Sequence, residues 1–438
     1  MNPNKSVSMH KIYLGPHEVA GYLSGLSQGF RTLGLPVTYN TIFSNKYLYE
    51  GEDYSRTCSL IRKFELHQTS ISSRPLRRVL KGIIRILRIY YFLTMLFKHD
   101  VFIFIFGISL LKNNKDLPIY KFFNKVVIFH MGMGSESRPP YVNGTQIRLN
   151  EDRIKATQRM VLLSKKKRNS LAFIEKNATV IIGAPLSTSA FASKRMINHF
   201  CIGLPVRKIE KIFQNSTKEY SEIVEILHAP SNPIAKGSDV IKKVINELKA
   251  EGLKIHLTEI VNRPNREVLE AISNSDLIVD QLYSDTPMAV FATEAAGFGK
   301  PSVVAGYGFE LLDQFIPTDM LPPSYICRPD QIKEAIKTLV VNKKLRQSMG
   351  RQAKDFVDSK WTAEEVARKY MYIIEGEVPT TWWFDPESIN YPYGAGISKE
   401  AIIDNIRAIV SEFGVSGLGL SGRPELEQEY LKIAGIST

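Results

Sequence analysis

The amino-acid sequence predicts an α/β protein with two Rossmann-like domains that face each other across a cleft. The chain has 438 residues, which is too long for one ordinary core and fits two domains of about 150 to 200 residues with additions. Apolar strands alternate with helices along it, a pattern that produces parallel sheets flanked by helices. The alternation pauses after residue 200 and starts again at Ile223, so two such units are expected.

The first run of alternation contains short apolar strands. Lys11–Leu14 is a predicted strand, and Val19–Leu33 after it has the apolar spacing of a helix. Val101–Phe106 and Val126–His130 are continuous apolar stretches of strand length, which is typical of strands buried on both faces of a parallel sheet. Thr179–Ile182 is the next predicted strand. We expect these elements to form one domain over residues 1–205.

The second run is more regular and follows a less ordered connection at Gly203–Lys218. Its predicted elements are, in chain order, strand Ile223–His228, helix Asp239–Glu251, strand Lys254–Ile260, helix Asn265–Ser273, strand Leu277–Asp280, helix Phe291–Phe298, strand Ser302–Ala305 and helix Gln331–Asn342. A second Rossmann-like domain is therefore expected over residues 206–375. Residues 376–438 depart from the pattern, with an aromatic stretch at Thr380–Tyr393 and an amphipathic helix at Ser398–Phe413. We interpret them as a C-terminal appendage of unknown role.

Composition and charge limit the classes of partner. Apolar residues make up 44 % of the chain and charged residues 23 %, which indicates a globular protein. The net charge of +13 and the pI near 9.4 favour an anionic partner: a nucleic acid, a lipid headgroup or a phosphorylated substrate. Because no recognised nucleic-acid-binding module occurs, we expect no nucleic acid partner.

The cysteines and the N-terminus indicate a cytoplasmic protein. Cys58, Cys201 and Cys327 are odd in number and form no CxxC pair, which argues against a disulfide framework or a zinc site. The first residues lack the uninterrupted apolar run of a signal peptide. Val79–Leu111 is the longest apolar region, but charged residues interrupt it, so a membrane-spanning helix is not expected.

A cluster of basic residues suggests contact with a membrane surface. Six of them recur every three or four positions with no acidic residue between them: Arg74, Arg77, Arg78, Lys81, Arg85 and Arg88. On a helix they form a basic face opposite apolar side chains, which suits the anionic inner face of the cytoplasmic membrane. We expect Arg77, Lys81, Arg85 and Arg88 to make that contact. The alternative is a core helix with a solvated face.

The stretch from His228 to Pro301 carries the residues that indicate a chemistry. A strand ends at His228, and a turn with Lys236 and Gly237 opens the next helix. Glu294 lies near the start of a later helix. A lysine and helix N-termini at the ends of parallel strands suit a diphosphate, and a carboxylate there suits a ribose.

This pattern resembles the donor-binding half of the GT-B glycosyltransferases, particularly the large family-4-like group (glycosyl transferases group 1), which includes surface-polysaccharide enzymes. The likeness is strongest over His228–Pro301 and weaker over Lys11–Gly34 and Asp100–Arg138. It implies the GT-B fold and the transfer of a sugar from a nucleotide-diphosphate sugar to a lipid-linked or surface-polysaccharide acceptor. It implies no cofactor other than this donor substrate.

The resemblance assigns roles to two residues. In such enzymes the lysine of a Lys-Gly turn contacts the donor diphosphate, so Lys236 would neutralise charge on the departing nucleoside diphosphate. Glu294 corresponds to the second acid of an E-x7-E pattern that binds the donor ribose. Thr286 replaces the first acid, although Asp280 and Asp285 lie nearby in sequence. The alternative role for Glu294 is to stabilise a helix N-terminus.

Other donor-binding candidates follow from their positions. Ser231 and Asn232 precede the Lys-Gly turn, where the family usually has an arginine that this chain lacks. Asp280 and Gln281 close a strand at the expected crevice; the alternative is a polar strand end that caps the next helix. Gly15, in the loop after the first strand, allows the backbone to approach a phosphate closely.

His130 is the third catalytic candidate, with Lys236 and Glu294. It follows an apolar strand and precedes Gly132, where the family often keeps a histidine that faces the sugar. An imidazole there would orient the anomeric centre or a sugar hydroxyl, and it titrates in a useful pH range. The chain contains 8 histidines, so a structural role for this one is the alternative.

Other motifs fit the sequence less well. Gly25–Gly29 matches the G-x-S-x-G of hydrolases but lies inside a predicted helix, not at a strand-to-helix turn. Gly132–Gly134 lacks the third glycine of a dinucleotide fingerprint. No Asp-x-Asp motif occurs, so we expect no metal at the donor site. A GT-B sugar-nucleotide epimerase and a non-catalytic sugar-binding or partner subunit are the alternative functions, and Thr286 favours the second.

Overall fold

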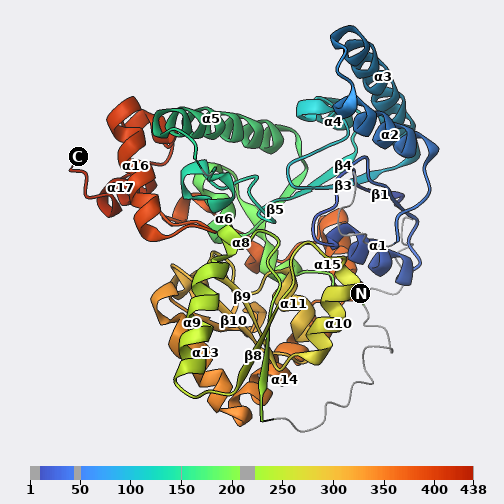
Figure 1. The fold of residues 1–438 in the computed structure, drawn as a ribbon. Coiled ribbons are helices and arrows are strands. Elements are labelled where there is room, and N and C mark those ends of the chain that lie inside the picture. The colour runs from blue at the N-terminus through green and yellow to red at the C-terminus, as the bar shows by residue number, and fades with distance from the viewer. Residues whose placement is uncertain (1–9, 44–50, 149, 208–221, 438) are drawn as a thin grey trace.

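The computed structural model describes residues 10–43, 51–148, 150–207 and 222–437 (Figure 1). Two parallel-sheet domains make up the molecule, the N-terminal one above the C-terminal one in this view. The predicted fold class, an α/β protein with two Rossmann-like domains facing each other, is confirmed. Most of the predicted irregular connection at Gly203–Lys218 lies outside the described residues.

The N-terminal sheet has seven strands in the order β12-β6-β5-β4-β3-β1-β2. These strands are β1 Ile12–Leu14, β2 Val37–Tyr39, β3 Val101–Ile105, β4 Val126–His130, β5 Val180–Gly183, β6 Met196–Asn198 and β12 Trp383–Phe384. All neighbours are parallel except β12 and β6. Every residue of β1 and β3 is buried, as their continuous apolar sequences predict for central strands.

The N-terminal domain also contains two long helices that the sequence analysis did not assign, α2 and α5. The helices of this domain are α1 Tyr22–Thr32, α2 Arg56–Ser70, α3 Arg74–Lys98, α4 Leu117–Phe122, α5 Arg153–Asn177, α6 Pro185–Thr188 and α7 His199–Ile202. The side chain of Ser55 caps α2, and that of Asp152 caps α5. α2 and α3 pack on each other, and α3 extends away from the rest of the molecule (Figure 1).

The C-terminal sheet has five parallel strands in the order β11-β10-β9-β7-β8. They are β7 Val224–His228, β8 Ile255–Glu259, β9 Leu277–Ser284, β10 Ser302–Gly306 and β11 Tyr325–Cys327. The helices are α8 Pro233–Lys236, α9 Ser238–Ala250, α10 Asn265–Asn274, α11 Val290–Gly297, α12 Leu312–Phe315, α13 Ile332–Val341 and α14 Lys343–Lys360. The strand order reverses between β7 and β9, which is the place where such sheets bind ligands.

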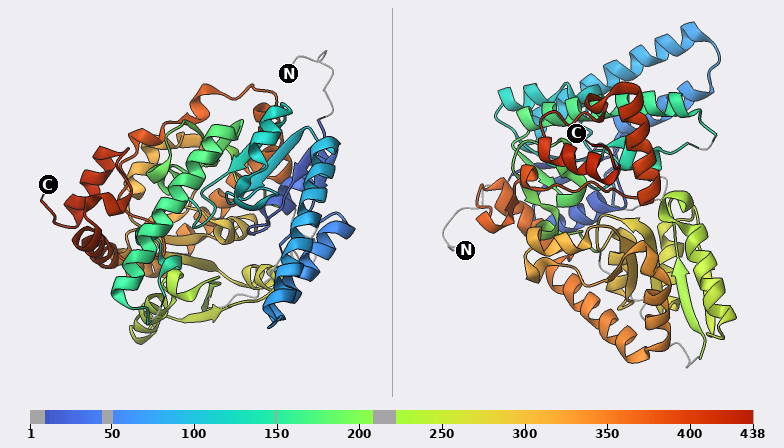
Figure 2. Two further views of the ribbon diagram at one scale, coloured as in Figure 1. Left: turned by 90° about the horizontal axis from the view of Figure 1, so that it is seen from above. Right: turned by 90° about the vertical axis from the view of Figure 1, so that its left-hand side faces the viewer.

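The end of the chain returns to the N-terminal domain. α15 (Ala363–Ile374) packs against α1, and this close approach requires Gly29, because a Cβ there would lie 1.9 Å from the carbonyl oxygen of Ala363. β12 then joins the N-terminal sheet. α16 (Lys399–Phe413) packs against α5, and Figure 2 shows the C-terminal helices beside the N-terminal domain from two further directions. The predicted appendage at 376–438 is thus an integral part of this domain.

The contact between α1 and α15 generates a prediction about stability. Gly29→Ala should destabilise the protein by about 1 to 3 kcal/mol, because the added methyl group overlaps the backbone of α15. Gly82→Ala is the matched control: Gly82 is also helical, and outside its own helix no described atom lies within 4 Å of the point that a Cβ would occupy. That change should stabilise by about 0.5 to 1 kcal/mol. Thermal and denaturant unfolding measure both, and an unchanged stability of the Gly29→Ala variant would contradict the packing.

Candidate functional site

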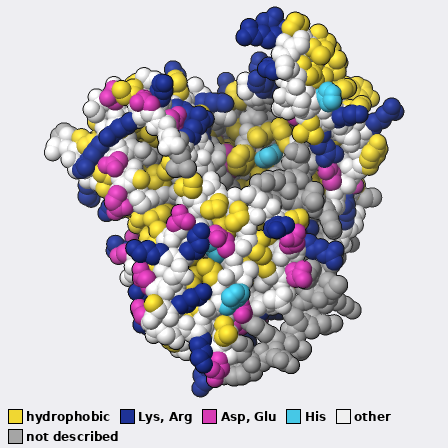
Figure 3. Space-filling view, viewed as in Figure 1, with side chains coloured by type: hydrophobic (Ala, Val, Ile, Leu, Met, Phe, Trp, Pro, Cys, Tyr) yellow, Lys and Arg dark blue, Asp and Glu magenta, His cyan; other side chains and the backbone are white. Residues whose placement is uncertain are grey.

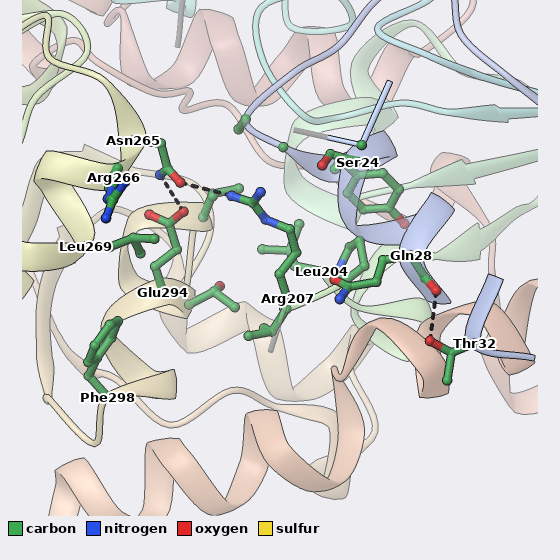
Figure 4. A pocket seen from close by; sticks show the side chains of 18 of the residues that line it. Ser24, Gln28, Thr32, Leu204, Arg207, Asn265, Arg266, Leu269, Glu294 and Phe298 are labelled. Carbon is green, nitrogen blue, oxygen red and sulfur yellow. Dashed lines mark hydrogen bonds between the residues drawn. The ribbon is translucent and has the colours of Figure 1, made fainter. Parts of the chain in front are cut away.

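A cavity of about 710 Å³ lies between the two domains. One wall comes from α1 and the connection Leu204–Arg207, and the other from α10 and α11 of the C-terminal domain (Figure 4). Apolar side chains such as Leu204 and Leu269 share this lining with several polar ones. A cavity of this size between domains, with a few polar groups in an apolar lining, is typical of small-ligand sites.

Three polar side chains form a hydrogen-bonded chain in this cavity. The amide of Asn265 donates to Glu294 Oε1 at 2.8 Å, and Arg207 Nη2 donates to Asn265 Oδ1 at 3.0 Å (Figure 4). Burial raises the pKa of the Glu294 carboxyl to about 7, against the lowering effects of the Asn265 hydrogen bond and the Arg207 charge. The arrangement offers a carboxylate for hydroxyl groups and a guanidinium for an anion.

Glu294 occupies the second turn of α11, whose first turn contains no acidic residue. The alternative that Glu294 acts by stabilising a helix N-terminus therefore finds no support. The side chain instead faces the cavity with Val290 and Thr293, which lie up to one turn earlier on the same helix.

Lys236 and Asp280 form a separate pair at the switch point between β7 and β9. Lys236 ends α8, and its Nζ lies 3.0 Å from Asp280 Oδ1. The Asp280 side chain is 1 % exposed and that of Lys236 is 20 % exposed. Gly237 follows with φ 70°, and a Cβ there would lie 2.6 Å from Leu282 Cβ, so the Lys-Gly turn needs its glycine. The lysine is thus held beside the sheet by a buried carboxylate.

The neighbouring candidates have local structural roles. The side chain of Asn232 caps α8 by accepting a hydrogen bond from the Ala235 amide at 3.1 Å. Ser231 is exposed beside it. The amide of Gln281 donates to Ser284 Oγ, so it stabilises the end of β9.

Gly15 makes a close backbone approach, but to the protein itself. A Cβ at Gly15 would lie 2.2 Å from the carbonyl oxygen of Asn40 and 2.5 Å from Tyr13 Oη. The loop after β1 therefore packs against the end of β2. A contact between Gly15 and a phosphate stays a prediction.

His130 lies at the end of β4 and is 0 % exposed. Its Nδ1 is 2.9 Å from Tyr370 Oη, and its Nε2 is 2.6 Å from His199 Nδ1. Burial and the neighbouring His199 hold the pKa of His130 well below its ordinary value. Since Tyr370 belongs to α15 and also contacts Tyr22 of α1 at 3.1 Å, this group joins the returning chain to the sheet. A catalytic role for His130 stays a prediction.

The structure therefore divides the predicted site residues. Among the described residues, the cavity lining includes Glu294 but none of Gly15, His130, Ser231, Asn232, Lys236, Asp280 and Gln281. Sequence reasoning missed Arg207 and Asn265, which come from the interdomain connection and the first position of α10. Arg207 brings a guanidinium to the same cavity wall as Glu294, through its hydrogen bond to Asn265.

An ion pair joins the domains beside the end of β9. Arg138, from the loop after β4, donates from Nη2 to Asp285 Oδ1 at 2.7 Å and from Nε to Asp285 Oδ2. Ser187 Oγ donates to the same carboxylate at 2.8 Å. The Asp285 side chain is 1 % exposed, and its carboxylate is engaged by Arg138 of the N-terminal domain. It is not available to replace the acid that is missing at Thr286.

The four predicted membrane-contact residues have two kinds of environment. Lys81 and Arg85 are exposed on α3. Arg88 pairs with Glu65 of α2 at 2.6 Å, and Arg77 donates to the carbonyl oxygen of Ile71 at 3.2 Å, so both are directed toward α2. No helix in the described ranges combines the length and the apolar character that crossing a membrane requires.

Comparisons with known proteins give likenesses of structure only. No protein-family model matches the sequence, and no curated protein matches it. Solved structures with a similar chain include sucrose-phosphate synthase from Thermosynechococcus elongatus, at 13 % identity and a TM-score of 0.47 over 84 % of this chain and 98 % of that one. HepE of Anabaena, in complex with UDP and glucose, has 12 % identity and a TM-score of 0.44 over 84 % and 100 %. The glycosyltransferase SsfS6 of Streptomyces sp. SF2575 has 10 % identity and a TM-score of 0.39 over 84 % and 99 %.

The raised pKa of Glu294 predicts a pH dependence of stability. A carboxyl whose pKa is higher in the folded state contributes stability that is fully present below its unfolded value, about 4.3, and is lost as the pH rises through about 7. Between pH 5 and 8, the free energy of unfolding of the wild type should therefore fall by about 1 to 3 kcal/mol relative to that of the Glu294→Gln variant. Urea unfolding at both pH values measures the difference. The control is Glu334→Gln, on the surface of α13; equal pH profiles for wild type and Glu294→Gln would contradict the assignment.

Proposed function

We propose that this protein is a glycosyltransferase that moves a sugar from a nucleotide-diphosphate sugar to a lipid-linked or surface-polysaccharide acceptor. The observation that carries the proposal is the cavity between the two Rossmann-like domains, with Glu294, Asn265 and Arg207 on its wall. A nucleoside diphosphate presents the matching groups, since it has ribose hydroxyls for the carboxylate and phosphates for the guanidinium. The sequence resemblance to the donor half of GT-B enzymes supports the same substrate class.

In the proposed reaction, the bond between the anomeric carbon and the diphosphate oxygen breaks, and the nucleoside diphosphate leaves with the electron pair. The oxygen of an acceptor hydroxyl forms the new glycosidic bond, and its proton passes to the departing diphosphate or to water. Glu294 accepts hydrogen bonds from the ribose, and Arg207 neutralises charge that develops on the leaving diphosphate. Lys236 lies outside the lining of the cavity, so the proposed contact between Lys236 and the diphosphate requires the donor to extend beyond that lining. Lys236 must then exchange part of its ion pair with Asp280 for contact with the diphosphate.

A non-catalytic nucleotide-sugar-binding subunit is the second candidate, and one observation favours it. The chain has Thr286 where resembling enzymes have an acid, and the adjacent Asp285 is engaged by Arg138. Such a protein would bind the donor in the cavity without turning it over. Binding and turnover must therefore be measured separately.

A panel of nucleotide-diphosphate sugars tests the proposal by thermal stabilisation and by release of nucleoside diphosphate. A ligand at 100 times its Kd should add about 2.7 kcal/mol to the free energy of unfolding. Lys236→Ala and Glu294→Gln should each lower turnover by about 10²-fold, because each removes a charge-assisted contact. Lys333→Ala is the matched control, since Lys333 is an ion-paired lysine on the surface of α13.

The outcomes separate the candidates. Stabilisation by one nucleoside type with product release supports the transferase. Stabilisation without turnover supports the non-catalytic subunit. If no nucleotide sugar stabilises the wild type while NAD does, the assignment of the cavity to a sugar donor is wrong.

Turnover is also expected to survive EDTA. The sequence contains no Asp-x-Asp motif, and cationic side chains are proposed to meet the diphosphate charge in its place. Initial rates with and without EDTA measure this. Loss of activity that Mn²⁺ or Mg²⁺ restores would contradict the expectation.

A further inference from the structure

One face of α3 carries large apolar side chains that no other part of the described structure covers. Six of them follow one another at intervals of three or four residues, and the side chain of each is at least 40 % exposed. They form what we term the α3 apolar stripe: Val79, Ile83, Ile86, Tyr90, Leu93 and Phe97. Ile86 is 68 % exposed and Phe97 is 71 % exposed. This spacing places them on one side of the helix.

The stripe is distinct from the face that anchors the helix. Leu80, Ile84 and Tyr91 of α3 are buried in the core of the N-terminal domain. The helix therefore has one apolar face that folding uses and a second that folding leaves in contact with water. A contiguous exposed apolar surface of this kind marks an interaction site.

The apolar surface continues onto α4. Phe123 lies with its ring centre 5.7 Å from that of Phe97, and Phe122 next to it is 80 % exposed. Both helices belong to the N-terminal domain, at the end away from the C-terminal domain (Figure 1).

The charges beside the stripe have one sign. Arg74, Arg78, Lys81 and Arg85 are exposed on α3, and the helix contains no acidic residue. Figure 3 shows Lys and Arg side chains next to apolar ones at the free end of α3. An apolar stripe flanked by cations complements a surface that is apolar below and anionic above, which is the interface of an anionic bilayer.

We propose that α3 lies flat in the interface of an anionic membrane, with the α3 apolar stripe at the acyl boundary and Arg78 and Arg85 at the lipid phosphates. The inference deepens the proposed function, because it rests on that proposal for a membrane-borne acceptor and identifies the face that would meet the membrane. It differs from the expectation from sequence, in which the basic face alone makes the contact. Here the apolar stripe provides most of the affinity, and the cations make binding selective for anionic lipid.

Co-sedimentation with vesicles tests the proposal in the absence of any sugar nucleotide. The vesicles are phosphatidylcholine alone and phosphatidylcholine mixed with phosphatidylglycerol. Ile86→Gln/Phe97→Gln removes apolar area without changing charge and should weaken binding to the anionic vesicles at least tenfold. Arg78→Gln/Arg85→Gln should remove the preference for anionic vesicles and the sensitivity of binding to salt.

The matched control is Leu162→Gln/Val341→Gln, which changes two similarly exposed apolar residues, 68 % and 61 % exposed, on α5 and α13. Its binding should equal that of the wild type. Unfolding temperatures confirm that each variant is folded. Stabilisation by nucleotide sugar should persist in the stripe variant, so a failure of the donor assignment and a failure of the membrane inference give different results.

Three results would overturn the inference. The first is that the stripe variant binds vesicles as well as the wild type does. The second is that the wild type does not bind anionic vesicles at low salt. The third is that the wild type forms dimers in solution and does not bind vesicles, whereas the stripe variant is monomeric. That result would assign the stripe to a second copy of this chain.

Discussion

The buried ion pair between Arg138 and Asp285 fixes how the two domains meet. It connects the loop after β4 with the end of β9, and Ser187 adds a third point of contact. Taking two charges out of water is unfavourable, and removal of one partner from such a pair typically costs about 3 to 5 kcal/mol. α11, which carries Glu294 on the cavity wall, begins five residues after Asp285, so this contact between the domains lies close in sequence to the cavity.

The return of the chain to the N-terminal domain depends on buried polar side chains. His130, His199, Tyr370 and Tyr22 form a continuous hydrogen-bonded group between β4, α7, α15 and α1. Every member is buried, and such groups stabilise a unique arrangement only when their partners are in place. The histidine at the end of β4 thus contacts the returning chain, through a hydrogen bond between residues 240 positions apart in sequence.

The sequence was most informative where one local property decides the structure. Buried parallel strands such as Val101–Ile105 and Leu277–Ser284 must be apolar through most of their length, so the α/β class and the two sheets could be predicted. The edge strand Trp383–Phe384 and its neighbour Met196–Asn198 are too short to carry a pattern, and their pairing joins distant parts of the chain. For that reason the sequence alone predicts an appendage where the structure has a sheet edge and its covering helices.

The candidate site shows the same limit. Glu294 could be found from a local motif, and it does line the cavity. Arg207 and Asn265 could not, because they meet Glu294 only through the packing of the domains. Asp280 was expected to close a strand, but β9 continues to Ser284, and the ion pair of Asp280 with Lys236 depends on the geometry of the Lys-Gly turn.

The pairing of β12 with β6 has a consequence for biosynthesis. The strand that completes the N-terminal sheet, and the helices that cover α5, are encoded after the whole C-terminal domain. As the chain emerges from the ribosome, the C-terminal sheet has all its strands once Cys327 is out, whereas the N-terminal sheet still lacks its edge. Although domains generally fold in order from the N-terminus during synthesis, here the domain that begins first is the one that finishes last.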